Sequence, residues 1–504
     1  MTTTANVCDL CAAINKPHIL ETGDLPRSRT WQQSLVFLSD NANGKLLGHE
    51  QCAFWKLVWD GITSFHSNLD LSFNVSVRRD DLEHGTGPLV VTVQQLNRPD
   101  LQFYTPVGAG RSPWEAIGRG YSISPFGLSE SCTRLMRGWL EECTASQGKH
   151  SQCTAPILPY LPSRVIDVEL LHLHCAQPGE KAHYVALSHC WGGQSPIQTT
   201  MQNLDAHIAG LPPLPQTFAD AVAVTKALGT RYLWIDSLCI VQNSPEDWHA
   251  EVTKMAEVYE NAFFTISADA AASATDGFLR PPSRSFTPET PIPYTSMCGN
   301  SSTTTTTTSF LASGTILVRE RGTQALMLPF HSPVPPPPTP TQPSTRPLPR
   351  LIPISKLSTR GWVFQERVLA PRTLHFSRSE TAWECPSLCT CECSATSARN
   401  HLRTSLLKDF FTTAAGVSPP RSRQRPPPDE RWRREIVQEY SRLDLTVPTD
   451  RLVALGGLAA RMARLRGGGD EYLAGLWRGT LGRDLLWYCV HEREKDKDKA
   501  GGRI

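Results

Sequence analysis

The chain has 504 residues, of which 40% are hydrophobic and 40 are prolines, and its formal net charge is +2. This length allows two or three domains, and the balanced charge gives no sign of a nucleic-acid partner. No run of about 18 apolar residues occurs, and the first residues lack the charged and apolar parts of a secretion signal, so the sequence predicts neither a membrane span nor export. We therefore expect a cytoplasmic protein with reduced thiols.

Residues 1–155 are predicted to form an accessory α+β region. Short apolar runs at 34–38, 71–77 and 89–96 are typical of strands separated by polar turns. Thr133–Cys143 carries apolar residues at helical spacing, which predicts an amphipathic helix. Nothing in this part of the sequence assigns it a role.

The 15 cysteines are scattered, but two groups have partial metal-site spacing. One joins two pairs of possible zinc ligands, Cys8 and Cys11 with His49 and Cys52, across a gap longer than zinc modules usually have. The other, further along the chain, is too closely spaced for good chelate geometry. It consists of Cys385, Cys389, Cys391 and Cys393. The alternative is that both groups are ordinary buried thiols, and we assign no metal ligand to the functional site.

The most regular part of the sequence is the block 184–279, in which three apolar runs alternate with two helical patterns. The runs are Val185–Leu187, Tyr232–Ile235 and Phe263–Ser267. Thr217 and Ser244 are typical N-cap residues for the two helices. Apolar strands that alternate with helices favour a parallel sheet covered on both faces, so we predict a small Rossmann-like or flavodoxin-like α/β domain. Neither a G-x-G-x-x-G nor a P-loop motif is present, which argues against standard dinucleotide or nucleoside-triphosphate binding.

Residues 280–355 interrupt this order. They contain a run of threonines and a run of prolines, so we predict a disordered insertion. Ordered sequence resumes with a predicted helix at 360–369, where Arg360 and Glu366 flank an apolar face and could form a structural ion pair.

The end of the chain has a different composition again. We expect a proline-rich linker at 417–428 and a compact helical region at 430–490. A charged tail follows this region.

Three motifs resemble a known family when they are taken together and in order. They are Tyr184-Val-Ala-Leu-Ser-His-Cys-Trp-Gly192, the stretch Thr217–Ala268 with Tyr232-Leu-Trp-Ile-Asp-Ser-Leu-Cys-Ile240 inside it, and Ser358-Thr-Arg-Gly-Trp-Val-Phe-Gln-Glu366. They resemble the three signatures of the fungal heterokaryon-incompatibility (HET) domain, which we therefore place at 160–395. The insertion displaces the third signature, and the chain ends sooner after Trp487 than members of the family usually do.

The resemblance implies a role in fungal non-self recognition, where such domains trigger cell death after fusion of unlike hyphae. It also implies a protein partner or self-association. HET domains have been proposed as distant relatives of TIR domains, some of which hydrolyse NAD with one glutamate. NAD is thus a possible substrate, no cofactor is required, and a TIR-like parallel sheet is the expected fold.

Polar residues at the strand ends allow this chemistry. Ser188, His189 and Trp191 follow the first strand, Asp236 ends the second, and Glu251 lies in the second turn of the next helix. Because ligands bind beyond the carboxyl ends of parallel strands, we predict that Asp236 and Glu251 act as catalytic carboxylates. We predict that the other three contact NAD, with the indole of Trp191 stacked on a ring.

Other interpretations stay open. Glu251 could be a solvated helix residue and His189 a turn residue bonded to the backbone. Cys190 or Cys239 could be a nucleophile with His189 as its base, although neighbouring residues at a strand end point in different directions. Finally, the domain could be a non-enzymatic signalling module that acts by self-association.

Overall fold

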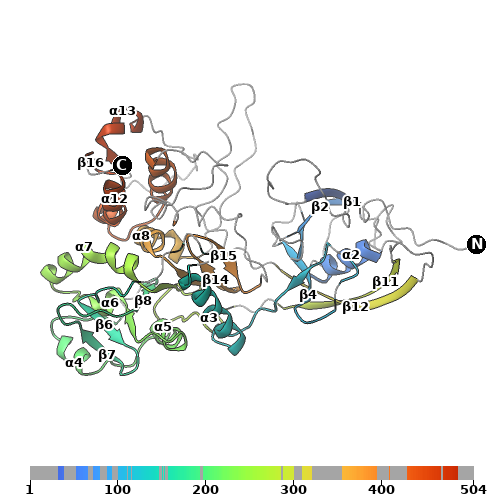
Figure 1. Ribbon diagram of the computed structural model, residues 1–504, viewed down its shortest axis with the longest axis horizontal. Helices are drawn as coiled ribbons and strands as arrows, with labels where there is room; N and C mark the ends of the chain where they lie inside the picture. The colour runs from blue at the N-terminus through green and yellow to red at the C-terminus, as the bar shows by residue number, and fades with distance from the viewer. Residues whose placement is uncertain are drawn as a thin grey trace, which may run out of the picture.

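The protein is described by a computed structural model. The structure describes residues 32–38, 53–65, 72–79, 88–93, 100–146, 150, 153, 157–284, 288–299, 309–320, 355–393, 408, 428–466 and 469–485, with short gaps at 111, 115 and 193–196. Two β-sheets and a helical C-terminal region dominate it (Figure 1).

The first sheet belongs mainly to the N-terminal region. Its strands pair in the order β1, β2, β3, β4, β12, β11, all antiparallel, and the short β5 joins β4 in parallel. They are β1 (Gln32–Leu38), β2 (Ser72–Arg79), β3 (Leu89–Val93), β4 (Leu101–Pro106), β5 (Arg119–Gly120), β11 (Thr290–Gly299) and β12 (Ser309–Glu320). Helix α2 (Ala53–Phe65) buries Phe54, Trp55 and Val58 in the same apolar core as the strands.

Two strands of this sheet come from the segment that the composition predicts to be disordered. Leu317–Glu320 of β12 pairs with Leu101–Tyr104 of β4, and Ile316 and Val318 are fully buried. The structure therefore differs from the prediction at β11 and β12. Their β-branched residues were hidden in the average composition of the surrounding threonine and proline runs, which lie outside the described residues.

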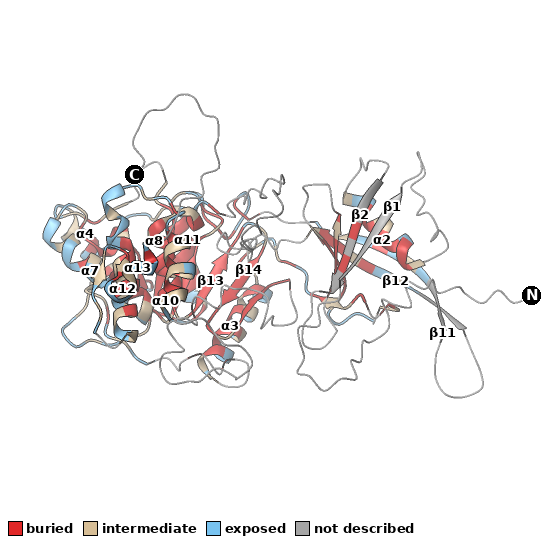
Figure 2. Cartoon of the chain, turned by 90° about the horizontal axis from the view of Figure 1, so that it is seen from above, coloured by how far each residue is buried: buried red, intermediate tan, exposed pale blue. Residues whose placement is uncertain are grey.

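The second sheet has eight strands in the order β15, β14, β13, β10, β8, β9, β6, β7. They are β6 (Arg164–Asp167), β7 (His172–Cys175), β8 (Tyr184–Ser188), β9 (Tyr232–Trp234), β10 (Phe264–Ser267), β13 (Thr373–Phe376), β14 (Thr381–Glu384) and β15 (Cys389–Cys391). The four middle strands are parallel, whereas both edges are antiparallel. Nearly all residues of these middle strands are buried, and Figure 2 shows β13 and β14 as buried and α4 and α7 as partly exposed.

The predicted small parallel sheet of Rossmann, flavodoxin or TIR type is therefore wrong, because the sheet is larger and mixed. Apolar periodicity reveals a buried strand but not its direction. The connections β6–β7 and β13–β14 are four residues each, 168–171 and 377–380, and such short links can join only antiparallel neighbours.

Helices cover the second sheet on both sides. They are α3 (Glu130–Thr144), α4 (Leu204–Ala209), α5 (Gln216–Ala227), α6 (Asp236–Cys239), α7 (Pro245–Asn261) and α8 (Gly361–Leu369). Ser244 caps α7 as predicted, since its Oγ accepts a hydrogen bond from the N–H of Asp247. Thr217 is not the N-cap of α5. The helix begins at Gln216, and the Thr217 hydroxyl donates to the carbonyl of Ser273 instead.

The C-terminal region packs on α7 and α8. It contains α10 (Pro428–Arg431), the π-helix η6 (Trp432–Val437), α11 (Gln438–Tyr440), α12 (Val453–Leu465), the hairpin β16–β17 (Tyr472–Leu473 and Leu476–Trp477) and α13 (Leu481–Asp484). Trp432, Leu458 and Trp477 share a buried core with Phe364 of α8. The predicted helical region is thus interrupted by a hairpin, while 417–427 and the tail lie outside the described residues.

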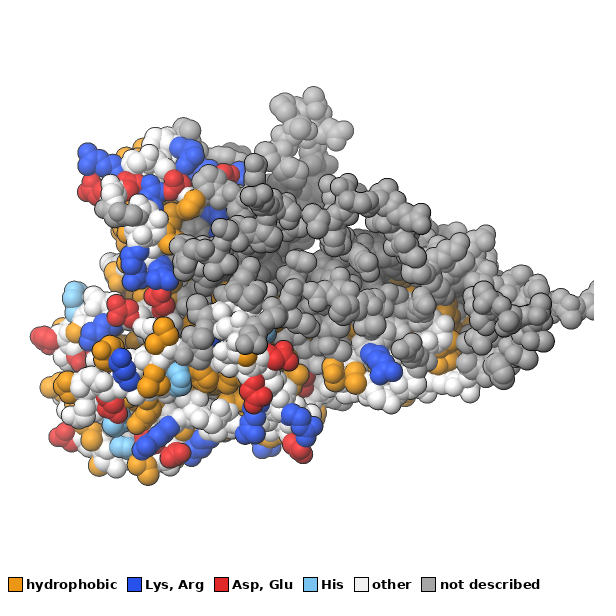
Figure 3. Space-filling view, in the orientation of Figure 1, with side chains coloured by type: hydrophobic (Ala, Val, Ile, Leu, Met, Phe, Trp, Pro, Cys, Tyr) orange, Lys and Arg blue, Asp and Glu red, His pale blue; other side chains and the backbone are white. Residues whose placement is uncertain are grey.

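Within the described part of the chain, no helix is long and apolar enough to cross a membrane. On the face shown in Figure 3, acidic, basic and hydrophobic side chains are interspersed.

Arg284 links three segments inside the molecule. Its guanidinium is fully buried and donates hydrogen bonds to the carbonyl of Ser124, to Oγ1 of Thr381 and to the carboxylate of Glu392. The ion pair with Glu392 is 2.5 Å long. Removal of the cation would leave a buried carboxylate without its charge partner.

We expect Arg284→Ala to lower the free energy of unfolding by about 3–5 kcal/mol, because an uncompensated buried charge remains. Urea denaturation followed by tryptophan fluorescence measures this. Arg280→Ala is the matched control, since Arg280 is exposed and lies over the ring of Phe126 at 4.1 Å; it should cost about 1 kcal/mol or less. Equal losses for both variants would show that the buried ion pair does not stabilise this junction.

Candidate functional site

The carboxyl ends of β8 and β10 form a topological switch point. From β8 the chain crosses to β9 on one side, whereas from β10 it continues to β13 on the other side. In open sheets, ligands bind in the crevice that such a reversal creates beyond the strand ends. The polar side chains at this edge are therefore the first candidates for a binding site.

Six side chains gather at this edge, and we name them the strand-end cluster. They are Ser188, His189, Trp191, Asp236, Arg360 and Glu366. The first three end or follow β8, Asp236 opens α6 after β9, and the last two belong to α8 and its N-cap. Four of the five site residues predicted from the sequence thus lie together.

Asp236 is the partly exposed carboxylate of the cluster, with 23% of its side chain accessible. Its Oδ2 accepts a 2.9 Å hydrogen bond from Nε1 of Trp191, and its Oδ1 accepts one of 2.7 Å from the N–H of Ser237. Oδ1 also lies 3.9 Å from Nδ1 of His189. Asp236 therefore orients the indole, and its side chain is partly exposed.

His189 is a buried member of the strand-end cluster. Its ring packs edge-on against Phe218 at a centroid distance of 5.0 Å. Burial lowers the pKa of His189 below its usual value, although the Asp236 carboxylate opposes this effect. Its Nε2 has no hydrogen-bond partner among the residues that the structure describes. A neutral imidazole with such a nitrogen can bind a polar group of a ligand.

Glu366 is a buried carboxyl group that sequence reasoning missed as part of the site. The hydroxyl of Ser188 donates a hydrogen bond to Oε2 of Glu366, which lies 178 residues further along the chain. Burial raises the pKa of Glu366 to about 7, and the Asp236 carboxylate adds to this effect while Ser188 and Arg360 oppose it. The only signal for this role was the third motif, which ends at Glu366.

Arg360 adds a positive charge to the cluster. Its guanidinium donates a 3.3 Å hydrogen bond to the carbonyl of His189. Among the described residues it forms no ion pair with Glu366, so the predicted Arg360–Glu366 pair is absent there. Arginine at this position suits an anionic group such as a phosphate.

The loop after β8 requires glycine at position 192. Gly192 has φ +83°, and a Cβ added there would lie 2.7 Å from Cβ of Ser273. Any other residue would be strained in conformation and would collide with this neighbour. Gly192 therefore fixes the path of the loop that carries Trp191.

Glu251 lies in a different setting from the cluster. Its Oε1 accepts a 2.7 Å hydrogen bond from Ser163 and lies 3.2 Å from Nζ of Lys254. In the described part of the chain it has no hydrogen bond or ion pair with Asp236, His189 or Trp191. Its catalytic role stays a prediction, and the structure shows it as a buried, paired helix residue.

A second polar network lies on the other side of the switch point. Nδ1 of His375 is 2.9 Å from Asp269, and Nε2 is 3.1 Å from Glu384, which also pairs with Arg367. Burial by itself would lower the pKa of His375, but the two carboxylates raise it. Its members were not singled out in the sequence, because they come from two strands, a turn and a helix and share no motif.

Among the described residues, neither Cys190 nor Cys239 forms a nucleophile–base pair with His189. Burial raises the pKa of Cys190 above its usual value and that of Cys239 to about 12. Neither thiol is hydrogen-bonded to His189 among the described residues. A thiolate is therefore disfavoured at both positions.

The two cysteine groups considered from the sequence have different outcomes. The group Cys8, Cys11, His49 and Cys52 lies outside the described residues. The group near residue 390 divides in space. Cys389, Cys391 and Cys393 pack with Ile123 and Ala382, whereas Cys385 joins the main core.

The elevated pKa of Glu366 makes a pH-dependent stability difference testable. The folded pKa is about 7 and the ordinary value 4.5, so the unfolded state ionises first and wild-type stability falls as pH rises between these values. Glu366→Gln cannot ionise. Relative to wild type, this variant should gain on the order of 3 kcal/mol in unfolding free energy from pH 4 to pH 8.

Urea denaturation across this pH range measures the effect. Glu257→Gln, an exposed substitution on α7, is the control and should differ from wild type by the same amount at every pH. A constant difference between Glu366→Gln and wild type would mean that Glu366 ionises at an ordinary pKa.

One comparison with known proteins identifies a family. Residues 184–366 match the family model described as heterokaryon incompatibility protein (HET). No curated protein and no solved structure matches the chain. The match begins with β8 and ends at Glu366, so both of its ends contribute to the strand-end cluster. Residues 184–366 therefore belong to the heterokaryon incompatibility (HET) family, and the chain carries a HET domain.

Proposed function

We propose that this protein is a cytoplasmic effector of fungal non-self recognition, and that its HET domain cleaves NAD at the strand-end cluster and so triggers cell death. Membership of the family implies a role in heterokaryon incompatibility. The reaction and the cell-death outcome are the proposal. Its support is the position of one carboxylate, that of Asp236.

Asp236 is the partly exposed acid of a cluster in which Ser188, His189 and Glu366 are buried. It lies directly after β9 at the edge of the sheet where the chain direction reverses, and its carboxylate is partly exposed. Beneath it, Glu366 has a pKa of about 7. Strongly shifted pKa values of neighbouring acids are typical of functional sites. The combination favours a site that handles charge over a purely structural turn.

The other members of the cluster suit a dinucleotide. Trp191 is partly buried and anchored through its Nε1, so its ring can stack on a base or on nicotinamide. The guanidinium of Arg360 can pair with a phosphate. Nε2 of His189 is buried without a hydrogen-bond partner among the described residues, so a ribose hydroxyl could bind it once the ligand enters the cluster.

The proposed reaction needs a carboxylate next to the ribose. The bond between ribose C1′ and the nicotinamide nitrogen breaks, and its electron pair remains on nicotinamide. The resulting oxocarbenium ion is stabilised by a nearby negative charge. Water then adds to C1′ and transfers a proton to the carboxylate of Asp236, which yields ADP-ribose. Asp236 is placed for both roles because it is the accessible acid of the cluster.

A second candidate is a non-enzymatic module that acts by self-association or on a protein partner. The internal contacts of the cluster favour this alternative. Trp191 is bonded to Asp236 and Ser188 to Glu366, as in a polar network that only holds a fold together. Activity measurements on variants separate the two candidates.

We expect the full-length protein at high concentration to release nicotinamide from NAD. Asp236→Asn should reduce the rate at least about 100-fold, because the charge that stabilises the transition state is removed. Glu257→Gln, exposed and outside the cluster, should keep wild-type activity. Chromatographic quantification of nicotinamide measures the rate, and circular dichroism confirms that each variant is folded.

Glu251→Gln decides between the two predicted carboxylates. A loss with this variant and none with Asp236→Asn would move the reaction to Glu251. If folded wild type releases no nicotinamide, and wild type and Asp236→Asn are equally toxic on overexpression, the NAD reaction is wrong and the self-association alternative is favoured.

A further inference from the structure

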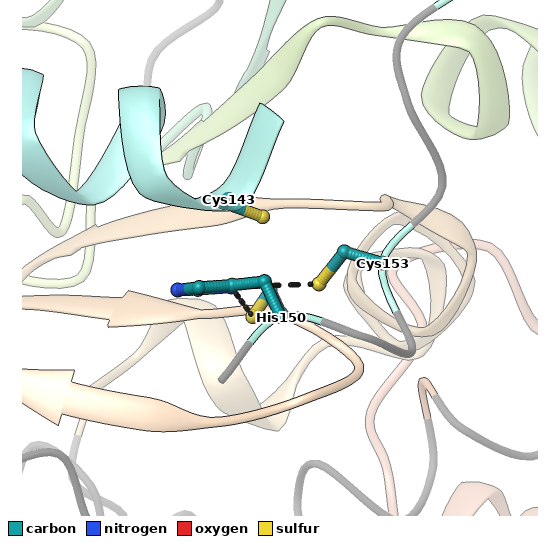
Figure 4. A group of neighbouring side chains, drawn as sticks. Cys143, His150 and Cys153 are labelled. Carbon is teal, nitrogen blue, oxygen red and sulfur yellow. Dashed lines mark hydrogen bonds between the residues drawn. The ribbon is translucent and has the colours of Figure 1, made fainter. Parts of the chain in front are cut away.

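Four potential metal ligands meet away from the strand-end cluster. They are Cys143, His150, Cys153 and Cys385. All four residues are buried, and their ligand atoms lie within 4.8 Å of one another. Cys143 is one residue from the end of α3, His150 and Cys153 follow that helix, and Cys385 directly follows β14. Figure 4 shows the side chains of Cys143, His150 and Cys153 close to one another.

Two nitrogen–sulfur distances in this group fit tetrahedral zinc coordination, and the remaining ligand atoms lie within 4.8 Å of one another. Nδ1 of His150 lies 3.6 Å from Sγ of Cys153 and 3.5 Å from Sγ of Cys385. Zinc binds sulfur at about 2.3 Å and imidazole nitrogen at about 2.0–2.1 Å, so tetrahedral angles place these two atoms about 3.6 Å apart. Thiol–imidazole hydrogen bonds have the same length, so zinc is favoured by the convergence of four ligands and not by these distances alone.

The donor set is also that of a structural zinc site. Three cysteines and one histidine form a common closed site with no open position for water. The three thiols are free cysteines in the structure, so none is committed to a disulfide. The sequence Cys143-x₆-His150-x₂-Cys153 supplies three ligands locally, and Cys385 arrives from the other end of the domain.

We propose that Cys143, His150, Cys153 and Cys385 bind one structural zinc ion. Zn²⁺ displaces the protons of the three thiols, and neutral His150 binds through Nδ1, so the site releases three protons and carries a net charge of −1. No oxidation is involved.

The site ties a flanking segment to the domain. Three ligands precede the HET match at 184–366 and one follows it, so the ion joins residues from both sides of the matched range. The surrounding contacts link the same parts. Cys132 of α3 lies 3.5 Å from Thr381 of β14, and Sγ of Cys153 lies 3.2 Å from Oγ of Ser387. Zinc would fix the end of α3 against the turn between β14 and β15.

Metal analysis of the full-length protein, purified with zinc under reducing conditions, tests the proposal. We expect about one zinc ion per chain from this site. Cys153→Ser and Cys385→Ser should lose it, whereas Cys132→Ser should retain it. Cys132 is the matched control, because it is a buried thiol on α3 outside the group. His150→Cys should keep the ion, since it restores a fourth ligand, while His150→Ala should lose it.

A second measurement does not depend on the folding of variants. X-ray absorption at the zinc edge of wild type should show three sulfur ligands and one nitrogen.

The double variant Cys8→Ser/Cys11→Ser tests whether the bound zinc belongs to the N-terminal group instead, and it should leave the signal unchanged.

Three results would overturn the proposal. The first is folded wild type without zinc. The second is zinc whose content and sulfur signal persist in Cys153→Ser and Cys385→Ser. The third is a disulfide between two of the three cysteines, found by mass spectrometry of protein kept reduced during purification.

Discussion

The hydrogen bond between Ser188 and Glu366 is the contact on which the architecture of the domain depends. A carboxyl group removed from water is costly unless it finds a polar partner. Here the partner is the last residue of β8, and the acid lies on α8, 178 residues later. The segment 189–365 must therefore return the chain to the carboxyl end of β8. The contact between Ser188 and Glu366 holds α8 at this end of the sheet.

The same contact gives the strand-end cluster its electrostatic character. The Asp236 carboxylate helps to raise the pKa of Glu366, and of these two acids Asp236 is the partly exposed one. A ligand that bears a positive charge near the cluster would favour ionisation of Glu366. The protonation state of the buried group and the occupancy of the site are therefore linked.

Local features of the fold were predictable, and features made by distant residues were not. The cap at Ser244 and the buried strand at 185–187 follow from short patterns, and both were confirmed. Strand direction was not predictable from periodicity, and pairing of β12 with β4 required knowledge of a partner about 200 residues away. In the site, Asp236 was placed by its position after a strand. Cys143, His150 and Cys153 are close in the sequence, but Cys385 lies 232 residues after Cys153, so only the folded chain completes the group of four.

The hairpin of β11 and β12 has a consequence for the order of assembly. After β10 the chain leaves the second sheet and forms β11 and β12, and β12 pairs with β4 in the first sheet. The chain then returns to the second sheet and forms α8 and β13. During synthesis, β1 to β4 are made early. The strands that complete their sheet, β11 and β12, are made only after β8, β9 and β10. The two sheets are therefore interleaved in the chain, and the N-terminal region cannot finish folding as an independent unit before the HET domain is more than half synthesised.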